Sequence, residues 1–283
     1  MDTHASPSDP VVRILEADPI LRTRLRPGSS WEMKVAGRTV LMDVDEFGCR
    51  PVNKQPLVGQ RVFAAYGCSC TFGHAIAASE TFPTLLQVMS PSWRIENYGV
   101  PGYGTTQNLL HLQRNARWRT ADYVTFCWIP HHLSRNIADI SWVRSLMPKS
   151  DPRRQSTLPR ASIGTDGKVE IEVAKLPRWD LDGLDLTAFQ PDAFYLELVC
   201  LKLFERASEI VRESGGHFFV TTLLGNMSEH LRSRLRDADI PLVNASLEGR
   251  EFTNLPDDHH PNALANQIYA QKIYDYLESH HVA

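Results

Sequence analysis

Ser69 is the residue of this chain whose surroundings most clearly suggest chemistry. It follows an apolar run, Val62 to Tyr66, that is short enough for a buried strand, and a glycine, Gly67, that permits a sharp turn. A helical pattern interrupted by Pro83, Ala75 to Met89, comes next. The spacing predicts a serine between a strand and the start of a helix, where α/β proteins bind ligands and free N–H groups face developing negative charge.

A serine at such a turn is also a favoured helix cap. The residues near the C-terminus are what favour a role of Ser69 as a nucleophile. Two acids and two histidines, Asp257, Asp258, His259 and His260, precede the last helical pattern. A serine nucleophile needs a base within hydrogen-bond reach and a carboxylate that orients the base. An acid two or three residues before a histidine supplies both from one loop.

Two more polar loops follow predicted strands. The first, Glu96 to Gly104, holds three glycines in six residues, which suits a tight loop whose backbone approaches a ligand closely; a plain strand-to-helix turn is the alternative. It does not match G-x-G-x-x-G, which excludes a dinucleotide site. The second, Trp128 to Asn136, carries two adjacent histidines. We interpret this segment either as part of the ligand-binding edge of the sheet or as a solvated loop, rather than as a metal site.

Composition limits the remaining possibilities. The chain has 283 residues, 42% of them hydrophobic, enough for one large domain or one domain with a small appendage. Its net charge of −3 and the lack of a basic block argue against a nucleic-acid partner. No apolar run is long enough to cross a bilayer. The polar N-terminus has no signal pattern, so we expect a cytoplasmic location. Five cysteines without C-x-x-C spacing indicate reduced, mostly buried thiols.

Strands and helices are predicted to alternate from Arg61 onward. Predicted strands cover 62–66, 93–97, 123–129, 217–223 and 241–245; predicted helices cover 75–89, 105–118, 193–214, 227–238 and 263–277. This alternation predicts a parallel sheet covered by helices on both faces.

Two segments lie outside that alternation. Residues 1–60 are predicted as a small β-rich extension: 1–10 disordered, a helix-like piece at 11–17, a Pro27-Gly28 turn, and strands 31–35 and 38–44 joined at Ala36-Gly37. The main domain then covers 61–283, with a polar insertion at about 149–191 that contains an Asp166-Gly167 hairpin turn. We interpret the insertion as an ordinary surface loop; the alternative is a shield that keeps water from an acyl-enzyme.

Three motifs in this order resemble the SGNH (GDSL-like) hydrolases. Gly67 to Gly73 is similar to the first block of a subgroup that reads G-x-S-x-T-F-G, Asn97 to Gly102 to the second block, and Asp257 to Asn262 to the D-x-x-H-P-N block. The resemblance runs from about Arg61 to the C-terminus, without the insertion. It implies a flavodoxin-like three-layer α/β/α sandwich with a central parallel sheet that hydrolyses or transfers acyl esters without a cofactor or metal.

The resemblance also implies roles for individual residues. Ser69 would be the nucleophile, His260 the base, and Asp257 or Asp258 the acid, with a slight preference for Asp257. The oxyanion would be held by backbone N–H groups of Ser69 and Gly102. Side chains of the same loops are candidates for substrate binding: Asn97, Tyr103, His132 and Asn136.

The chain departs from the family pattern at two positions. Cys68 stands where the usual aspartate follows the first glycine. The asparagine of the third block, an oxyanion donor in the family, is missing at its expected place; His131 stands at about that position, and Asn136 lies a turn later. An imidazole N–H can donate to an oxyanion, whereas a lost donor costs about 2.7–4 kcal/mol of transition-state stabilisation. Either His131 substitutes, or the enzyme is slow, or the reaction differs.

The predicted function is hydrolysis of a carboxylic ester on a small molecule, an acylated metabolite or an acylated sugar, through a Ser-His-Asp triad and an acyl-enzyme. Alternatives are an acyltransferase with the same triad and a binding protein that lost catalysis. Two more are a nucleophilic Cys68 or Cys70 and a metal-dependent hydrolase that uses residues 257–260. The acyl group, the alcohol and the oligomeric state stay open.

Overall fold

A five-stranded parallel sheet forms the centre of the protein. The computed structural model describes residues 14–52, 61–140, 142–143, 157–175 and 191–280. Its central strands are β5 (Arg61–Gly67), β6 (Trp93–Gly99), β7 (Tyr123–Trp128), β10 (His217–Leu224) and β11 (Leu242–Leu247), in the spatial order β11-β10-β7-β5-β6. This is the flavodoxin-like order, and its switch point lies between β5 and β7, where such folds bind ligands.

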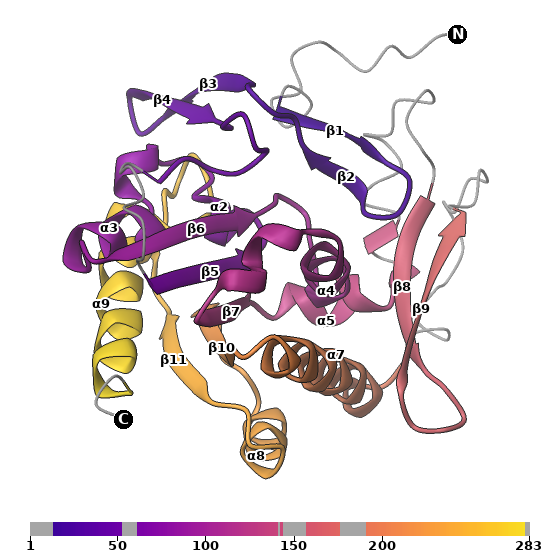
Figure 1. Cartoon of the computed structure of the whole chain (residues 1–283). Coiled ribbons are helices and arrows are strands. Elements are labelled where there is room, and N and C mark those ends of the chain that lie inside the picture. Colours follow the sequence, from indigo (N-terminus) through magenta and orange to yellow (C-terminus); the bar gives the residue numbers. More distant parts are fainter. Residues whose placement is uncertain (1–13, 53–60, 141, 144–156, 176–190, 281–283) are drawn as a thin grey trace, which may run out of the picture.

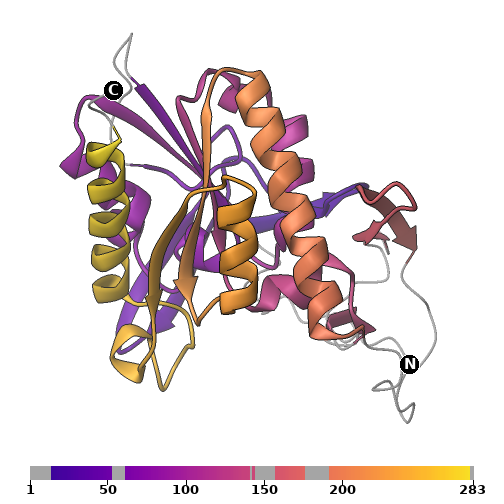
Figure 2. The same cartoon turned by 90° about the horizontal axis from the view of Figure 1, so that it is seen from below.

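Helices cover both faces of this sheet, which confirms the predicted three-layer arrangement. Helices α3 (Phe82–Met89) and α9 (Ala263–Ser279) pack together on one face. Helices α4 (Thr105–Arg114), α5 (His131–Asn136), α7 (Ala193–Glu213) and α8 (Glu229–Asp237) lie on the other. Figure 1 shows the sheet between these groups, and Figure 2 shows α9 on one side with α7 and α8 on the opposite side.

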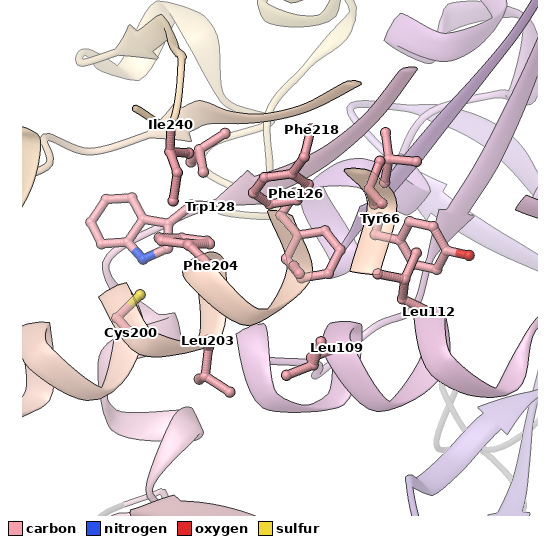
Figure 3. Packing of buried hydrophobic residues seen from close by; sticks show 14 of the residues in the cluster. Tyr66, Leu109, Leu112, Phe126, Trp128, Cys200, Leu203, Phe204, Phe218 and Ile240 are labelled. Atoms are coloured by element: carbon pink, nitrogen blue, oxygen red, sulfur yellow. The ribbon is translucent and has the colours of Figure 1, made fainter. Parts of the chain in front are cut away.

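Each face of the sheet buries its own hydrophobic cluster, because both sides of a covered parallel strand must be apolar. Tyr66, Phe126 and Trp128 point from the strands toward Leu109 of α4 and Phe204 of α7 (Figure 3). The opposite cluster joins alternate strand residues to α3 and α9, and includes Phe63, Phe219 and Tyr269. These two layers fix the ends of the strands, and therefore the loops that follow them.

Two antiparallel hairpins precede the sheet. They are β1 (Leu15–Asp18) with β2 (Arg22–Leu25), and β3 (Ser30–Val35) with β4 (Arg38–Asp43). The predicted strands at 31–35 and 38–44 are thus confirmed. The predicted helix-like piece is wrong within its described part, because residues 15–18 pair as a strand with residues 22–25. The predicted disordered residues 1–10 lie outside the described residues.

Several other boundaries differ from the sequence prediction. The helix predicted from Ala75 begins only at Phe82, since Pro83 occupies its first turn, where a missing N–H costs nothing. Short helices α2 (Ser69–Phe72) and α5 were not predicted. The hairpin expected at Asp166-Gly167 is confirmed by β8 (Thr157–Ile163) and β9 (Val169–Lys175); much of the rest of the insertion lies outside the described residues.

Three 3-10 helices connect the larger elements within the described residues. They are η1 (Ala78–Glu80) before α3, η2 (Ala116–Thr120) after α4 and η5 (Arg250–Phe252) before the C-terminal loop. Within the described ranges, no helix has both the length and the apolar character needed to cross a membrane.

Candidate active site

Ser69 is the first residue of α2, directly after β5. The turn between them is tight: a side chain on Gly67 would overlap Thr71 and lie 3.1 Å from Cys127 Cβ. Asn97 of the neighbouring strand fixes the turn from the side, because its Nδ2 donates to Thr71 O at 2.9 Å. The local sequence therefore folds so that Ser69 projects beyond the carboxyl end of the sheet.

Ser69, His260 and Asp258 form a continuous row of polar contacts. His260 Nε2 lies 2.8 Å from Ser69 Oγ, and His260 Nδ1 lies 2.7 Å from Asp258 Oδ1. An ionised carboxylate only accepts hydrogen bonds, so the ring proton belongs on Nδ1 and leaves Nε2 free to accept from the serine hydroxyl. Ser69 is 8% exposed and the His260 side chain 29%, so the row is reachable from solvent.

The C-terminal loop holds His260 in this position through its backbone. Asn254 N and Nδ2 donate to His260 O at 3.0 and 3.2 Å. Asn262 Nδ2 donates to Thr253 O at 3.0 Å, and Asn262 also caps α9 by accepting from Ala265 N. The asparagine in the H-P-N motif thus closes the loop and starts the helix.

The adjacent carboxylates of the loop have different partners. Asp258 Oδ1 accepts from both the backbone N and the Nδ1 of His260, each at 2.7 Å. Asp257 Oδ2 instead accepts from Ala36 N, in the β3–β4 turn, at 2.6 Å. The preference for Asp257 as the acid beside the histidine therefore needs correction, since the contact with the N-terminal hairpin draws that carboxylate away.

Electrostatics around the row favour an ionised Asp258 and a neutral His74. Burial alone would raise the pKa of Asp258, but hydrogen bonds and charge from His260, with a smaller effect of His74, outweigh it and lower that pKa. Burial, followed by the proximity of His260, lowers the pKa of His74 to about 4. His74 is 8% exposed, and its ring centroid lies 4.4 Å from that of His260.

Two backbone N–H groups near Ser69 have no acceptor among the residues that the structure describes. Among the hydrogen bonds of the described residues, none has the backbone N of Ser69 or Gly102 as its donor. Gly102 has φ +86°, and a Cβ built on it would meet no atom within 4 Å, so this part of the loop faces open space. Val100 N donates to Gly67 O at 3.0 Å, which brings the two loops together.

His131, the side chain expected from the sequence as a further oxyanion donor, is exposed at the start of α5 after β7. Burial of part of its ring, together with the neighbouring Arg135 and His132, lowers its pKa. A neutral imidazole at neutral pH still carries one N–H that can donate to an oxyanion.

The four candidates for substrate binding lie in the interior, so the expectation of direct substrate contact is not supported. Asn97 holds the turn around Ser69, and Tyr103 donates through its hydroxyl to Thr23 O at 2.7 Å. His132 lies 3.4 Å from Thr105 Oγ1, and Asn136 Oδ1 accepts from Thr106 N at 3.1 Å. All four are at most 1% exposed, so they position the loops instead.

The competing sites fit the geometry less well. Cys68 and Cys70 are buried on either side of Ser69, so neither thiol is presented to a substrate. Contact with Cys70 lowers the pKa of the Cys68 thiol, whereas contact with Cys68 and burial raise that of Cys70. The tetrapeptide 257–260 does not converge on one point, because Asp257 turns to Ala36 and His259 is exposed.

Two residues near the site, His74 and Arg50, were not identified by the sequence analysis. His74 directly follows the first motif, and no spacing rule distinguishes it. Arg50 has a fully buried side chain that donates to Asp43 Oδ1 at 2.8 Å and to Ile76 O at 2.9 Å, and its guanidinium lies 4.8 Å from the ring centre of Phe72. It joins β4 to the segment that follows α2.

No protein-family model and no curated protein matches the sequence. Among solved structures, the chain is similar to a member of the lipolytic protein G-D-S-L family from Veillonella parvula, with 11% identity, 79% of this chain and 100% of that chain covered, and a TM-score of 0.45. It is also similar to the psychrotrophic esterase EstA from Pseudoalteromonas sp., with 10% identity, coverage of 78% and 98%, and a TM-score of 0.45. Similarity at this level concerns the fold and assigns no activity.

Proposed function

We propose that this protein is a serine hydrolase that cleaves carboxylic esters. The observation that carries the proposal is the row from Ser69 Oγ through His260 to Asp258, with separations of 2.8 and 2.7 Å. These are hydrogen-bond distances, and a hydroxyl, an imidazole and a carboxylate in this order are what nucleophilic acyl transfer requires.

In the first half-reaction, Ser69 Oγ attacks the acyl carbon while His260 Nε2 takes the hydroxyl proton. Asp258 stabilises the imidazolium that forms and keeps the ring in its orientation. The backbone N–H groups of Ser69 and Gly102 donate to the oxyanion, with His131 as a third donor. His260 then gives its proton to the alcohol oxygen, the carbon–oxygen bond breaks, and an acyl-enzyme remains.

In the second half-reaction, water attacks the acyl-enzyme while His260 takes one of its protons. Collapse of the tetrahedral intermediate returns a proton to Ser69 Oγ and releases the carboxylic acid. A second alcohol in place of water gives acyl transfer by the same steps. The substrate class that we propose is a small ester, such as an acylated metabolite or sugar, in a reaction that uses no cofactor.

The test is intact-mass labelling with a fluorophosphonate, followed by hydrolysis of p-nitrophenyl acetate. We expect one adduct on the native protein and none on Ser69→Ala. His260→Ala should label far more slowly, and kcat/KM of both variants should fall by about 10⁴-fold or more. Ser134→Ala is the matched control, because among the described residues that hydroxyl donates only to His131 O of its own helix.

An adduct on Ser69→Ala would show that another residue is the nucleophile. An unlabelled native protein would instead favour a binding protein with this fold. In either case the proposed function would be wrong, whereas loss of labelling in Ser134→Ala would mean that the substitutions act through the fold.

A further inference from the structure

His74 is a buried histidine that the proposed reaction does not use. Its side chain is 10% exposed. Its ring centroid lies 4.4 Å from that of His260 and 6.4 Å from that of Trp31 in β3. Its Nδ1 has no hydrogen-bond partner within the part of the chain that the structure describes. Its Nε2 faces Asp258 Oδ2 at 3.9 Å, which is too long for a hydrogen bond.

That separation suits an ion between the two groups. Zinc binds imidazole nitrogen and carboxylate oxygen at about 2.0–2.2 Å, so two ligand atoms of one ion lie roughly 3–4 Å apart. His74, Asp258 and His260 each offer one ligand atom, and these atoms lie within 4.8 Å of one another. Two imidazoles and one carboxylate form a ligand set that zinc uses while leaving a coordination position open.

We propose that His74, Asp258 and His260 form a binding site for Zn²⁺ or a similar divalent transition metal, and that occupancy of this site inhibits the esterase. The inhibitory part rests on the proposed function, whereas binding does not. Mg²⁺ and Ca²⁺ prefer oxygen ligands and should not bind a set with two imidazoles.

Inhibition follows from the double use of His260. If the metal binds Nδ1, the remaining ring proton is on Nε2, which then faces Ser69 as a donor and cannot accept the hydroxyl proton. If the metal binds Nε2, it occupies the place of the serine hydroxyl. In both cases Ser69 loses its base, and Asp258 binds the metal instead of orienting His260.

This ligand set differs from the tetrapeptide that the sequence suggested. Asp257 is engaged by Ala36 N, and His259 is exposed. The third ligand comes instead from the nucleophile segment, which the fold brings against the C-terminal loop. Ligands from two separate segments can surround an ion, whereas four consecutive residues do so with difficulty.

The experiment is calorimetric titration of the full chain with ZnCl2, combined with the rate of fluorophosphonate labelling with and without ZnCl2. His74→Phe keeps a buried ring but removes both nitrogens, and His74→Ala provides a second test if the larger ring disturbs the fold. His230→Ala is the matched control, since it removes another histidine–carboxylate contact. His230 is on α8, and its Nδ1 lies 2.7 Å from Glu197 Oε2.

We expect zinc to bind the native protein and His230→Ala with equal affinity, and His74→Phe at least about tenfold more weakly, because one of three ligands is lost. Zinc should slow labelling of the native protein much more than that of His74→Phe, each compared with itself. Chelation should restore the rate, and MgCl2 should have no effect.

Equal zinc affinity of the native protein and both His74 variants would overturn the site. Tight, His74-dependent binding that leaves the labelling rate unchanged would overturn the inhibition. A native protein that fails to label even without zinc would contradict the proposed function alone, since the calorimetric comparison would still test the metal site.

Discussion

Two neighbouring aspartates show how much a single position decides in this site. Asp258 accepts from the backbone and side chain of His260, a short-range arrangement that an aspartate two residues before its donor commonly makes. Asp257 turns toward Ala36, more than two hundred residues earlier in the chain. The motif alone cannot choose between them, because the choice depends on a contact with a distant hairpin.

The two carboxylates should therefore respond differently to the same substitution. Asp258→Asn should lower kcat for p-nitrophenyl acetate by about 10³–10⁴-fold, because the amide favours the wrong tautomer of His260 and does not stabilise the imidazolium. Asp257→Asn should stay close to the native rate, since its oxygen can still accept from Ala36 N. Comparable losses in both variants would contradict the assignment of Asp258 as the acid.

At the scale of elements, the nucleophile turn depends on how closely α2 approaches β6. Gly67 and Gly99 are paired in register across β5 and β6. A Cβ on Gly99 would overlap the backbone N of Phe72 and lie 2.7 Å from the carbonyl carbon of Thr71. Backbone atoms cannot rotate away as a side chain can, so this glycine is required by packing.

Gly99→Ala should consequently lower the free energy of unfolding by about 1–3 kcal/mol and slow fluorophosphonate labelling of Ser69. Urea unfolding followed by tryptophan fluorescence measures the first effect. Gly28→Ala is the control: its φ of +68° is strained for alanine, but no atom lies within 4 Å, so a loss of about 1 kcal/mol without slower labelling is expected. Normal labelling of Gly99→Ala would argue against this account of the turn.

The sequence predicted the alternating strands and helices well, because five apolar runs and intervening helical patterns are local signals. It predicted the wrong state for residues 15–17, where a short helical pattern yields to pairing with β2. It also pointed to Ser69, His260 and Asp258; in the folded chain His260 lies within hydrogen-bond distance of the other two. It could not predict His74 or Arg50, or the burial of Asn97 and Asn136, because those depend on segments that meet only in the folded chain.

At the scale of the whole molecule, the N-terminal hairpins share a core with the sheet domain. Their buried residues, among them Leu25 and Met42, pack with Phe72 of α2 and with Tyr103 after β6. Figure 1 shows both hairpins along the edge of the molecule above β6 and α4. A second link is the ion pair of Arg114 Nη1 with Asp18 Oδ1 at 2.8 Å.

Asp18 should make stability depend on acid pH. Burial would raise its pKa, but the hydrogen bond from Arg114 and those from the backbone N of Leu21 and Ile20 lower it overall. Its contribution is therefore fully present above the unfolded pKa, near 3.9, and is lost as pH falls through the lower folded value.

Asp18→Asn should then lower the free energy of unfolding at neutral pH by about 1–3 kcal/mol, with a smaller difference from the native protein at low pH. Urea unfolding at a series of pH values measures both quantities. Glu16→Gln, which removes a more exposed pair with Arg24, should cost less than about 1 kcal/mol. A deficit in Asp18→Asn that does not shrink at low pH would show that the loss is not electrostatic.

The shared core also predicts that the hairpins and the sheet domain unfold together, and three of the buried thiols, Cys49, Cys127 and Cys200, can report this. Burial raises the pKa of Cys127 and Cys200 to about 12 and also raises that of Cys49, so these three native thiols should react very slowly with a disulfide reagent near neutral pH. Cys49 follows the hairpins, whereas Cys127 lies in β7 and Cys200 in α7.

In increasing denaturant we expect all three thiols to become reactive in one transition, because detaching the hairpins would expose Phe72 and Tyr103. Mass-spectrometric mapping of the labelled sites measures this, and reaction of Cys49 where Cys127 and Cys200 stay protected would mean that the extension opens on its own.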